Sequence, residues 1–382
     1  MLKKLSLLLT TLVIFSVAAG AVTLKDANNT LKNIKQKVAP DARQAIFEVE
    51  ATETPDGIAI SGIVDTPVAY QAVKDAFEGK ASTTGLELLP QNTWGQVMIP
   101  VACLRTGPAH AAELASQALM GMPVKIFGKA EGDWYRLQTP DGYIGYMPVS
   151  SVAEKTFAQL DQWRKGDRLV VTALDQVDAY TTPNPQGPRD IVTDLVNGSI
   201  VAGKLTGEKM VEIILPDGRK GWIAAEYVTP IEEWASQEFD PEVILNMAYS
   251  LHGTPYLWGG TSTKSVDCSG LAKVSYLANG IILMRDASQQ ATTGEKMTPK
   301  QWRKLEPGDL LFFGNPKTGR VTHVAIYDRD GNYIHSSGRV KVNSIDPNGE
   351  GYLTTPHLSS TRIKTRLDTR GITRAINHPW YF

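Results

Sequence analysis

The 382-residue chain has few cysteines and no surplus of charge of either sign. Its 39 lysine and arginine residues nearly balance its 40 aspartate and glutamate residues, so the formal net charge is −1. A nucleic-acid-binding protein normally has a basic surplus or a basic stripe, and this balance argues against that class. The two cysteines, Cys103 and Cys268, are too few for a disulfide scaffold, although a single bridge stays open at this point.

Metal-binding signatures are also missing. The sequence has no CxxC, no HExxH and no acidic calcium loop, which are the usual patterns for zinc or calcium ligands. We therefore expect no metal and no other cofactor. Hydrophobic residues make up 42% of the chain and charged residues 21%, a composition that can bury a sizeable core. At about 100–200 residues per domain, the length suggests two to four domains.

A long apolar run occurs only at the start of the sequence. Lys3 and Lys4 precede the apolar residues 5–17, and Ala19-Gly20-Ala21 fits a signal-peptidase cleavage site. The run is shorter than the ~20 residues of a spanning helix. We therefore interpret residues 1–21 as a secretory signal and expect an exported protein of the periplasm, cell envelope or medium. No later segment is apolar enough to predict a membrane span.

Residues 22–95 predict a small α/β unit without a chemical motif. Hydrophobic periodicity indicates helices over 24–38 and 68–78, and strands over 45–51 and 57–64.

A short pattern then occurs twice, 76 residues apart. Pro140-Asp141-Gly142-Tyr143-Ile144-Gly145-Tyr146-Met147 is followed by Pro216-Asp217-Gly218-Arg219-Lys220-Gly221-Trp222-Ile223, and an alternating strand precedes each copy. Each Asp-Gly favours a tight hairpin turn, because glycine tolerates the positive φ that such turns need. The pattern resembles bacterial SH3-like domains and predicts two small β-barrels, over 96–153 and 168–230.

Residues 240–382 predict an α+β domain, because helical patterns come first and strands follow. One helix begins after Asp240 and ends at Gly253. A second runs from Asp267 to about Asn279, and the first long strand begins at Gly308.

Cys268 stands in the first turn of the second helix, where free amide groups and the helix dipole favour an anion. We therefore expect its thiol to lose a proton easily. A nucleophilic cysteine also needs a base, and His323 and His335 lie on the two strands of one predicted hairpin. A three-residue loop, Arg329-Asp330-Gly331, places Ala325 opposite His335 and both histidines on one face. A buried structural cysteine and a Cys-His-His zinc site are the alternatives left open.

Five motifs in this order resemble the NlpC-type cysteine peptidases, which are papain-like cell-wall hydrolases. The motifs are Pro255-Tyr256-x-Trp258-Gly259-Gly260, Asp267-Cys268-Ser269-Gly270, Pro307-Gly308-Asp309-Leu310, His323-Val324-Ala325-Ile326-Tyr327 and Ile334-His335. With its SH3-like modules, the chain is similar to γ-D-glutamyl-L-diamino acid endopeptidases of the dipeptidyl-peptidase VI type. The resemblance implies hydrolysis of the γ-D-glutamyl bond to diaminopimelate or lysine in peptidoglycan stem peptides or muropeptides.

The resemblance also implies the catalytic roles. Cys268 attacks the carbonyl carbon, His323 acts as general base and acid, and His335 orients His323. Tyr256, together with amides at the helix start, stabilises the oxyanion. The alternative for Tyr256 is a core aromatic residue behind the loop.

Further residues are implied in substrate binding. Asp267 and Ser269 contact the amino-terminal end of the substrate, although Asp267 is equally suited to be only the helix cap. Trp258 lines the pocket or packs in the core. Arg285 and Asp286 contact the stem peptide. Ala287 stands where well-matched relatives have serine, and Ser288 follows it.

The first SH3-like module is expected to select the substrate. Glu113 and Tyr143 resemble positions that hold a free L-alanine amine, and a Glu113 carboxylate facing Asp267 would form an acidic pocket for ammonium. The alternative for Glu113 is a solvated charge on a loop helix. Two other functions stay open: a muramoyl-L-alanine amidase on the same core, and a non-catalytic wall-binding module. A monomer is favoured.

Overall fold

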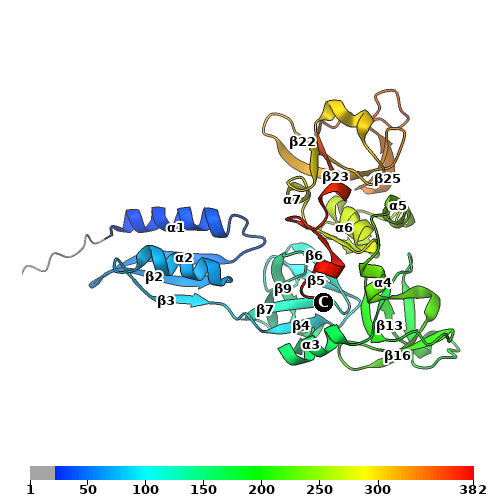
Figure 1. The fold of residues 1–382 in the computed structure, drawn as a ribbon, viewed down its shortest axis with the longest axis horizontal. Coiled ribbons are helices and arrows are strands. Elements are labelled where there is room, and N and C mark those ends of the chain that lie inside the picture. The colour runs from blue at the N-terminus through cyan, green and yellow to red at the C-terminus, as the bar shows by residue number, and fades with distance from the viewer. Residues whose placement is uncertain (1–21) are drawn as a thin grey trace, which may run out of the picture. The chain divides into compact units, whose positions relative to one another are not determined.

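The computed structural model describes residues 22–382 (Figure 1); the predicted signal segment, residues 1–21, lies outside this range. The chain forms two compact units, one ending at Leu89 and one running from Pro90 to Phe382. Within the described residues, no helix combines the length and the apolar character needed to cross a membrane.

The first unit is a three-stranded sheet with two helices. Its elements are α1 (Leu24–Val38), β1 (Phe47–Thr54), β2 (Gly57–Val64), α2 (Pro67–Phe77) and β3 (Ser82–Leu88). β1 is antiparallel and β3 parallel to β2. The side chains of Thr23 and Thr66 cap the two helices, and Ile60, Val73 and Phe77 lie in the core between helices and sheet. Both predicted helices are present.

The second unit begins with two seven-stranded sheets. The first contains β4 (Trp94–Val97), β5 (Val101–Arg105), β6 (Leu114–Leu119), β7 (Pro123–Ala130), β8 (Trp134–Gln138), β9 (Ile144–Pro148) and β10 (Val152–Lys155). The second contains β11 (Arg168–Val171), β12 (Val177–Tyr180), β13 (Ile191–Leu195), β14 (Ile200–Gly203), β15 (Met210–Ile214), β16 (Lys220–Ala224) and β17 (Val228–Pro230). Helix α3 (Phe157–Lys165) joins them. We call them the first and second modules.

The two modules have the same topology, which confirms the repeat. Their strand orders are β10-β4-β7-β8-β9-β5-β6 and, read from its other end, β17-β11-β14-β15-β16-β12-β13. The repeated motif forms the turns β8–β9 and β15–β16, where Gly142 and Gly218 have φ of 82° and 89°. Neither small β-barrel is closed by hydrogen bonds. No ladder joins the end strands of either sheet, and the short strands β10 and β17, of four and three residues, each pair with one neighbour.

The remaining residues form an α+β region, as predicted. Its helices are α4 (Ile231–Ala235), α5 (Pro241–Ser250), α6 (Cys268–Ala278) and α7 (Ala287–Gln290). Its six-stranded sheet has the order β21 (Glu295–Met297), β26 (His357–Arg362), β22 (Leu310–Asn315), β23 (Arg320–Tyr327), β24 (Asn332–Ser337) and β25 (Arg339–Ser344). Two small ladders pair β18 (Thr261–Ser262) with β19 (Ser265–Val266) and β20 (Ile281–Leu283) with β27 (Ile372–Arg374).

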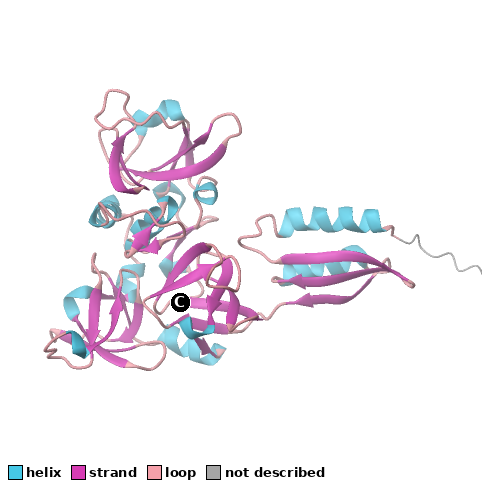
Figure 2. Ribbon diagram, turned by 180° about the vertical axis from the view of Figure 1, so that it is seen from behind, coloured by secondary structure: helices cyan, strands magenta, loops and turns pink. Residues whose placement is uncertain are grey.

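Helices α5 and α6 lie between this six-stranded sheet and the two modules (Figures 1 and 2). Asp267 caps α6 by accepting from the Gly270 amide, and Gly280 follows its C-terminus with φ of 66°. Leu271 and Val274 face the core that α6 shares with the sheet. This packing holds the first turn of α6 against β23.

Candidate active site

The two predicted histidines meet on one face of the β23–β24 hairpin. Ile326 pairs with Ile334 and Tyr327 with Tyr333, a register that continues to Ala325 opposite His335. Asp330 and Gly331 adopt positive φ in the turn, as the three-residue loop requires. His323 Nε2 lies 2.7 Å from His335 Nδ1. The predicted shared face is therefore confirmed.

Cys268 is the first residue of α6 and is 8% exposed. Its sulfur interacts with the backbone amides of Val324 and Ser269. Val324 directly follows His323 in β23, so the nucleophile lies beside the strand residue that carries the base. Since His335 occupies Nε2 of His323, Nδ1 is the ring nitrogen left for the thiol.

Burial is the main influence on the protonation of Cys268 and His323. It raises the pKa of the Cys268 thiol to about 11, assisted by the charge of Asp267 and opposed by the two amides. Burial also lowers the pKa of His323 to about 3, and the nearby His335 and the charge of Lys341 lower it further. The resting pair is therefore an uncharged thiol and an uncharged imidazole. The expectation of an acidic thiol is wrong, because desolvation outweighs the helix start.

Asn343 extends the histidine pair and was missed by the sequence analysis. His335 is 2% exposed, and its Nε2 lies 2.8 Å from Asn343 Oδ1. Lys341 stands opposite His335, and Asn343, two residues along β25, shares its face. The polar–apolar alternation of residues 339–343 predicts a strand with Lys341 and Asn343 on one face. It places Asn343 beside His335 only when the pairing of this strand with β24 is known.

Tyr256 lies beside the nucleophile. Its main chain pairs with Val266 and donates to the Gly338 carbonyl. Burial raises the pKa of its half-buried phenol, and the neighbouring Cys268 and Asp267 raise it further. The phenol therefore stays protonated and can donate a hydrogen bond, as the expected oxyanion role requires.

Asp267 and Arg285 form a buried ion pair behind the nucleophile. Asp267 also accepts from the amides of Gly270 (2.7 Å) and Gly259 (3.0 Å). Arg285 is 2% exposed and donates to Ser269 Oγ (2.8 Å) as well as to the Ala115 carbonyl (3.0 Å). The structure thus places Arg285 beneath the site, whereas the resemblance implied contact with the stem peptide.

The first module contributes side chains at the rim of the site. Glu113 is exposed in the loop before β6, without the helix considered for it, and accepts from Trp258 Nε1 at 2.7 Å. Trp258 is 62% exposed, so the alternative of a core residue is wrong. Tyr143 donates its hydroxyl to Asp286 Oδ2 at 3.3 Å.

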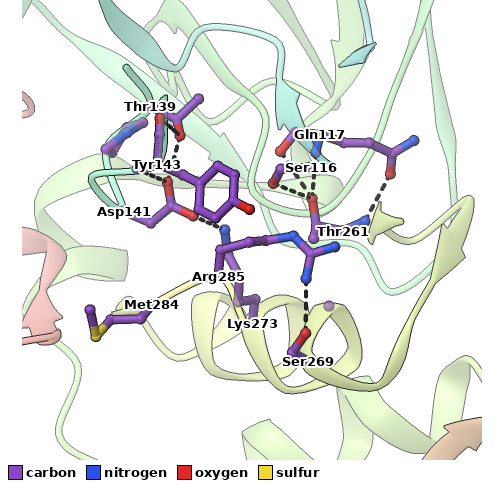
Figure 3. A network of polar contacts seen from close by, with 12 residues as sticks. Ser116, Gln117, Thr139, Asp141, Tyr143, Thr261, Ser269, Lys273, Met284 and Arg285 are labelled. Carbon is purple, nitrogen blue, oxygen red and sulfur yellow. Dashed lines mark hydrogen bonds and ion pairs between the residues drawn. The ribbon is translucent and has the colours of Figure 1, made fainter. Parts of the chain in front are cut away.

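A network of polar contacts fixes the first module to the catalytic region (Figure 3). Gln117 Oε1 accepts from the Thr261 amide at 2.9 Å, and Thr261 Oγ1 accepts from the Gln117 amide at 2.9 Å. Lys273 of α6 forms an ion pair with Asp141, whose side chain is 4% exposed. The ion pair of Lys273 thus ties the helix that carries the nucleophile to the first module.

The other sequence candidates lie near the rim or away from it. Asp286 caps α7 in a box with Gln289, and Ser288 is exposed on α7. Cys103 is half-buried on β5, and both cysteines are free. Within residues 22–382, no cluster of histidine, cysteine and carboxylate side chains has the form of a metal site.

The chain is similar in sequence to known proteins. Residues 253–361 match the NlpC/P60 family, and residues 104–152 match the bacterial dipeptidyl-peptidase SH3 domain. Dipeptidyl-peptidase 6 of Lysinibacillus sphaericus is 32% identical over 264 residues, which cover 65% of this chain and 91% of that protein. Gamma-D-glutamyl-L-lysine dipeptidyl-peptidase of Bacillus cereus is 29% identical over 258 residues, which cover 64% and 74%.

The fold agrees with a solved structure. An NlpC/P60 family protein from Bacillus cereus superposes with a TM-score of 0.61 at 22% identity, over 70% of this chain and 99% of that chain. The predicted fold class, SH3-like modules before a papain-like α+β region, is confirmed. The chain therefore belongs to the NlpC/P60 family of cysteine peptidases and carries an SH3-like module of the bacterial dipeptidyl-peptidase type.

Proposed function

We propose that the enzyme hydrolyses the γ-D-glutamyl–L-diamino acid bond of peptidoglycan stem peptides. The observation that carries this proposal is the pairing of the Cys268–His323–His335 site with two polar side chains of the first module, Glu113 and Tyr143. The relative from Bacillus cereus is named for the γ-D-glutamyl-L-lysine bond. Diaminopimelate and lysine are both within the proposal.

The chemistry is acyl transfer through a thioester. The S–H bond of Cys268 breaks as His323 takes the proton on Nδ1, and the sulfur attacks the γ-carbonyl carbon of D-glutamate. The oxyanion receives hydrogen bonds from Tyr256 and from amides at the start of α6. His323 then protonates the leaving amine of the diamino acid. Water, deprotonated by His323, hydrolyses the thioester and releases the dipeptide.

We assign recognition of a free L-alanine amine to Glu113 and Tyr143 of the first module. Arg285 already neutralises Asp267, so Asp267 offers little net charge to an ammonium group. Within residues 22–382, the indole of Trp258 is the one hydrogen-bond partner of the Glu113 carboxylate, and this partner is neutral. An ammonium group at the Glu113 carboxylate would form a charge-assisted hydrogen bond.

The proposal also covers the cellular location of the enzyme, its oligomeric state and its domain organisation. We propose an exported enzyme of the periplasm, envelope or medium that acts as a monomer, because one chain supplies the whole site. The first module, β4 to β10, is then the selecting module, residues 168–230 form a second SH3-like domain and 240–382 the peptidase domain. The N-terminal unit ends at Leu89 and not at residue 95.

Mass spectrometry of products tests the bond. Purified enzyme is mixed with L-Ala-γ-D-Glu-L-Lys and with the diaminopimelate tripeptide, and Cys268→Ala is the control. We expect release of L-Ala-D-Glu from at least one substrate and none with the variant. Cleavage between muramic acid and L-alanine in a muramoyl peptide, with both tripeptides intact, would make the enzyme an amidase. No cleavage of any substrate would favour a wall-binding role.

A further inference from the structure

We propose that Asn343 is a positioning residue that fixes which ring nitrogen of His323 carries the proton. Three contacts form a line from a loop to the catalytic base: Gly351 carbonyl to Asn343, Asn343 to His335, and His335 to His323. The inference rests on the cysteine peptidase chemistry and not on which peptide bond is cleaved.

The first step concerns the orientation of the Asn343 amide. The Gly351 carbonyl oxygen lies 2.7 Å from Asn343 Nδ2. A carbonyl accepts and never donates, so the NH2 end of the side chain must face Gly351. The oxygen end, Oδ1, then faces His335. The loop that follows β25 therefore sets the orientation of the amide, and Asn343 presents an acceptor to the histidine.

The second step fixes the proton on His335. Because Asn343 Oδ1 only accepts, His335 Nε2 must carry hydrogen across their 2.8 Å contact. Burial lowers the pKa of His335, so the ring is neutral and holds a single proton. Its Nδ1 is thus a bare acceptor.

The third step determines which nitrogen of His323 holds the proton. The bare Nδ1 of His335 requires a donor on His323 Nε2, 2.7 Å away. The neutral His323 ring then has no hydrogen on Nδ1, the nitrogen left for Cys268. The thiol proton has one place to go, and its transfer breaks the S–H bond and forms an N–H bond while the other protons keep their positions. Without the Asn343 acceptor, both rings are free to adopt the opposite tautomer, in which Nδ1 of His323 is blocked.

Charged and polar groups on several sides act on the two histidines. Lys341 lies opposite His335, and its positive field lowers the pKa of both histidines. Asp267 acts on His323 in the opposite direction. The negative end of the Asn343 carbonyl dipole faces His335 and stabilises the positive charge that the histidine pair gains during catalysis.

Two substitutions distinguish the contact of Asn343 with His335 from its contact with the Gly351 loop. Asn343→Asp keeps an acceptor for His335 but loses the donor to Gly351, whereas Asn343→Leu loses both. Asn348→Leu, in the same loop, is the matched control, because its side chain makes no hydrogen bond in the described structure. Rates are measured on the L-Ala-γ-D-Glu-diamino acid tripeptide that the wild type cleaves, and thermal melting establishes that each variant is folded.

We expect Asn343→Leu to lower kcat at least about tenfold with KM nearly unchanged, since a wrong tautomer removes the base and leaves binding intact. Asn343→Asp retains most of kcat and moves the acid limb of the pH profile to higher pH, because a carboxylate stabilises the protonated rings. Nitrogen-15 NMR of the imidazoles shows Nε2–H on both histidines in the wild type and mixed tautomers in Asn343→Leu. Equal loss in both variants, with unchanged tautomers, would overturn the proposal and leave Asn343 as a loop anchor.

Discussion

Trp258 donates its indole N–H to Glu113 across 2.7 Å, and this bond joins the catalytic region to the first module at the rim of the site. Trp258 is 62% exposed, so the bond lies at the surface and not in the core. The indole holds the carboxylate in place without neutralising it. This placement supports the proposal that Glu113 binds the ammonium group of the substrate.

Glu113→Gln tests this arrangement. The variant keeps an acceptor for Trp258 but loses the negative charge, and a charge-assisted hydrogen bond contributes about 1.5–3 kcal/mol. We expect kcat/KM on the free tripeptide to fall about 10–100-fold, mainly through KM. Glu131→Gln, at an exposed glutamate of the same module, should leave kcat/KM unchanged. Equal rates for Glu113→Gln and wild type would remove Glu113 from substrate recognition.

Arg285→Met tests the buried ion pair. The variant leaves the Asp267 carboxylate buried without its cation, which typically costs about 3–5 kcal/mol of stability. Urea unfolding should show this loss, and Asp267→Asn in the same chain should recover part of it. Arg370→Gln at an exposed position is the control. Unchanged stability together with a raised KM would support the contact of Arg285 with the stem peptide that the resemblance implied.

The repeat supplies a matched pair of sites for testing the contact between the first module and the catalytic region. Asp141 pairs with Lys273 of α6, whereas Asp217, at the equivalent position of the second module, pairs locally with Arg219. We expect Asp141→Asn to destabilise the enzyme, and Lys273→Met in the same chain to restore part of the loss. Asp217→Asn should change little. Additive effects of Asp141→Asn and Lys273→Met in urea unfolding would contradict the coupling.

Acid should destabilise the fold from pH 6.5 downward. Burial lowers the pKa of His323 to about 3, so between these values the unfolded chain binds the proton and the native chain does not. The free energy of unfolding is therefore highest above pH 6.5 and falls as the pH drops, by about 2 kcal/mol at pH 5 from this group alone. Urea unfolding at pH 8 and pH 5 should show a smaller difference in His323→Gln. An equal difference would show that His323 titrates normally.

Local signals account for what the sequence predicted. Two Asp-Gly turns 76 residues apart fixed the repeat, and the turn Arg329-Asp330-Gly331 fixed the register that brings His323 and His335 together. Turn type, helix caps and strand alternation each depend on a few neighbouring residues, so one sequence is enough to find them.

Properties that depend on distant segments were missed. Asn343 reaches His335 only through the pairing of β24 with β25. Arg285 is buried because Ala115 of the first module and Ser269 of α6 close over its guanidinium. The thiol pKa follows the burial of Cys268 in the assembled core, which the start of one helix does not reveal.

The most direct test compares one tripeptide in two forms, with its L-alanine amine free and with the amine acetylated, as substrates for the wild-type enzyme. Mass spectrometry follows release of the dipeptide over time. The account predicts rapid cleavage of the free peptide, strongly reduced cleavage of the acetylated one, and loss of this difference in Glu113→Gln. Equal cleavage of both forms by the wild type would contradict selection of the free amine by the first module.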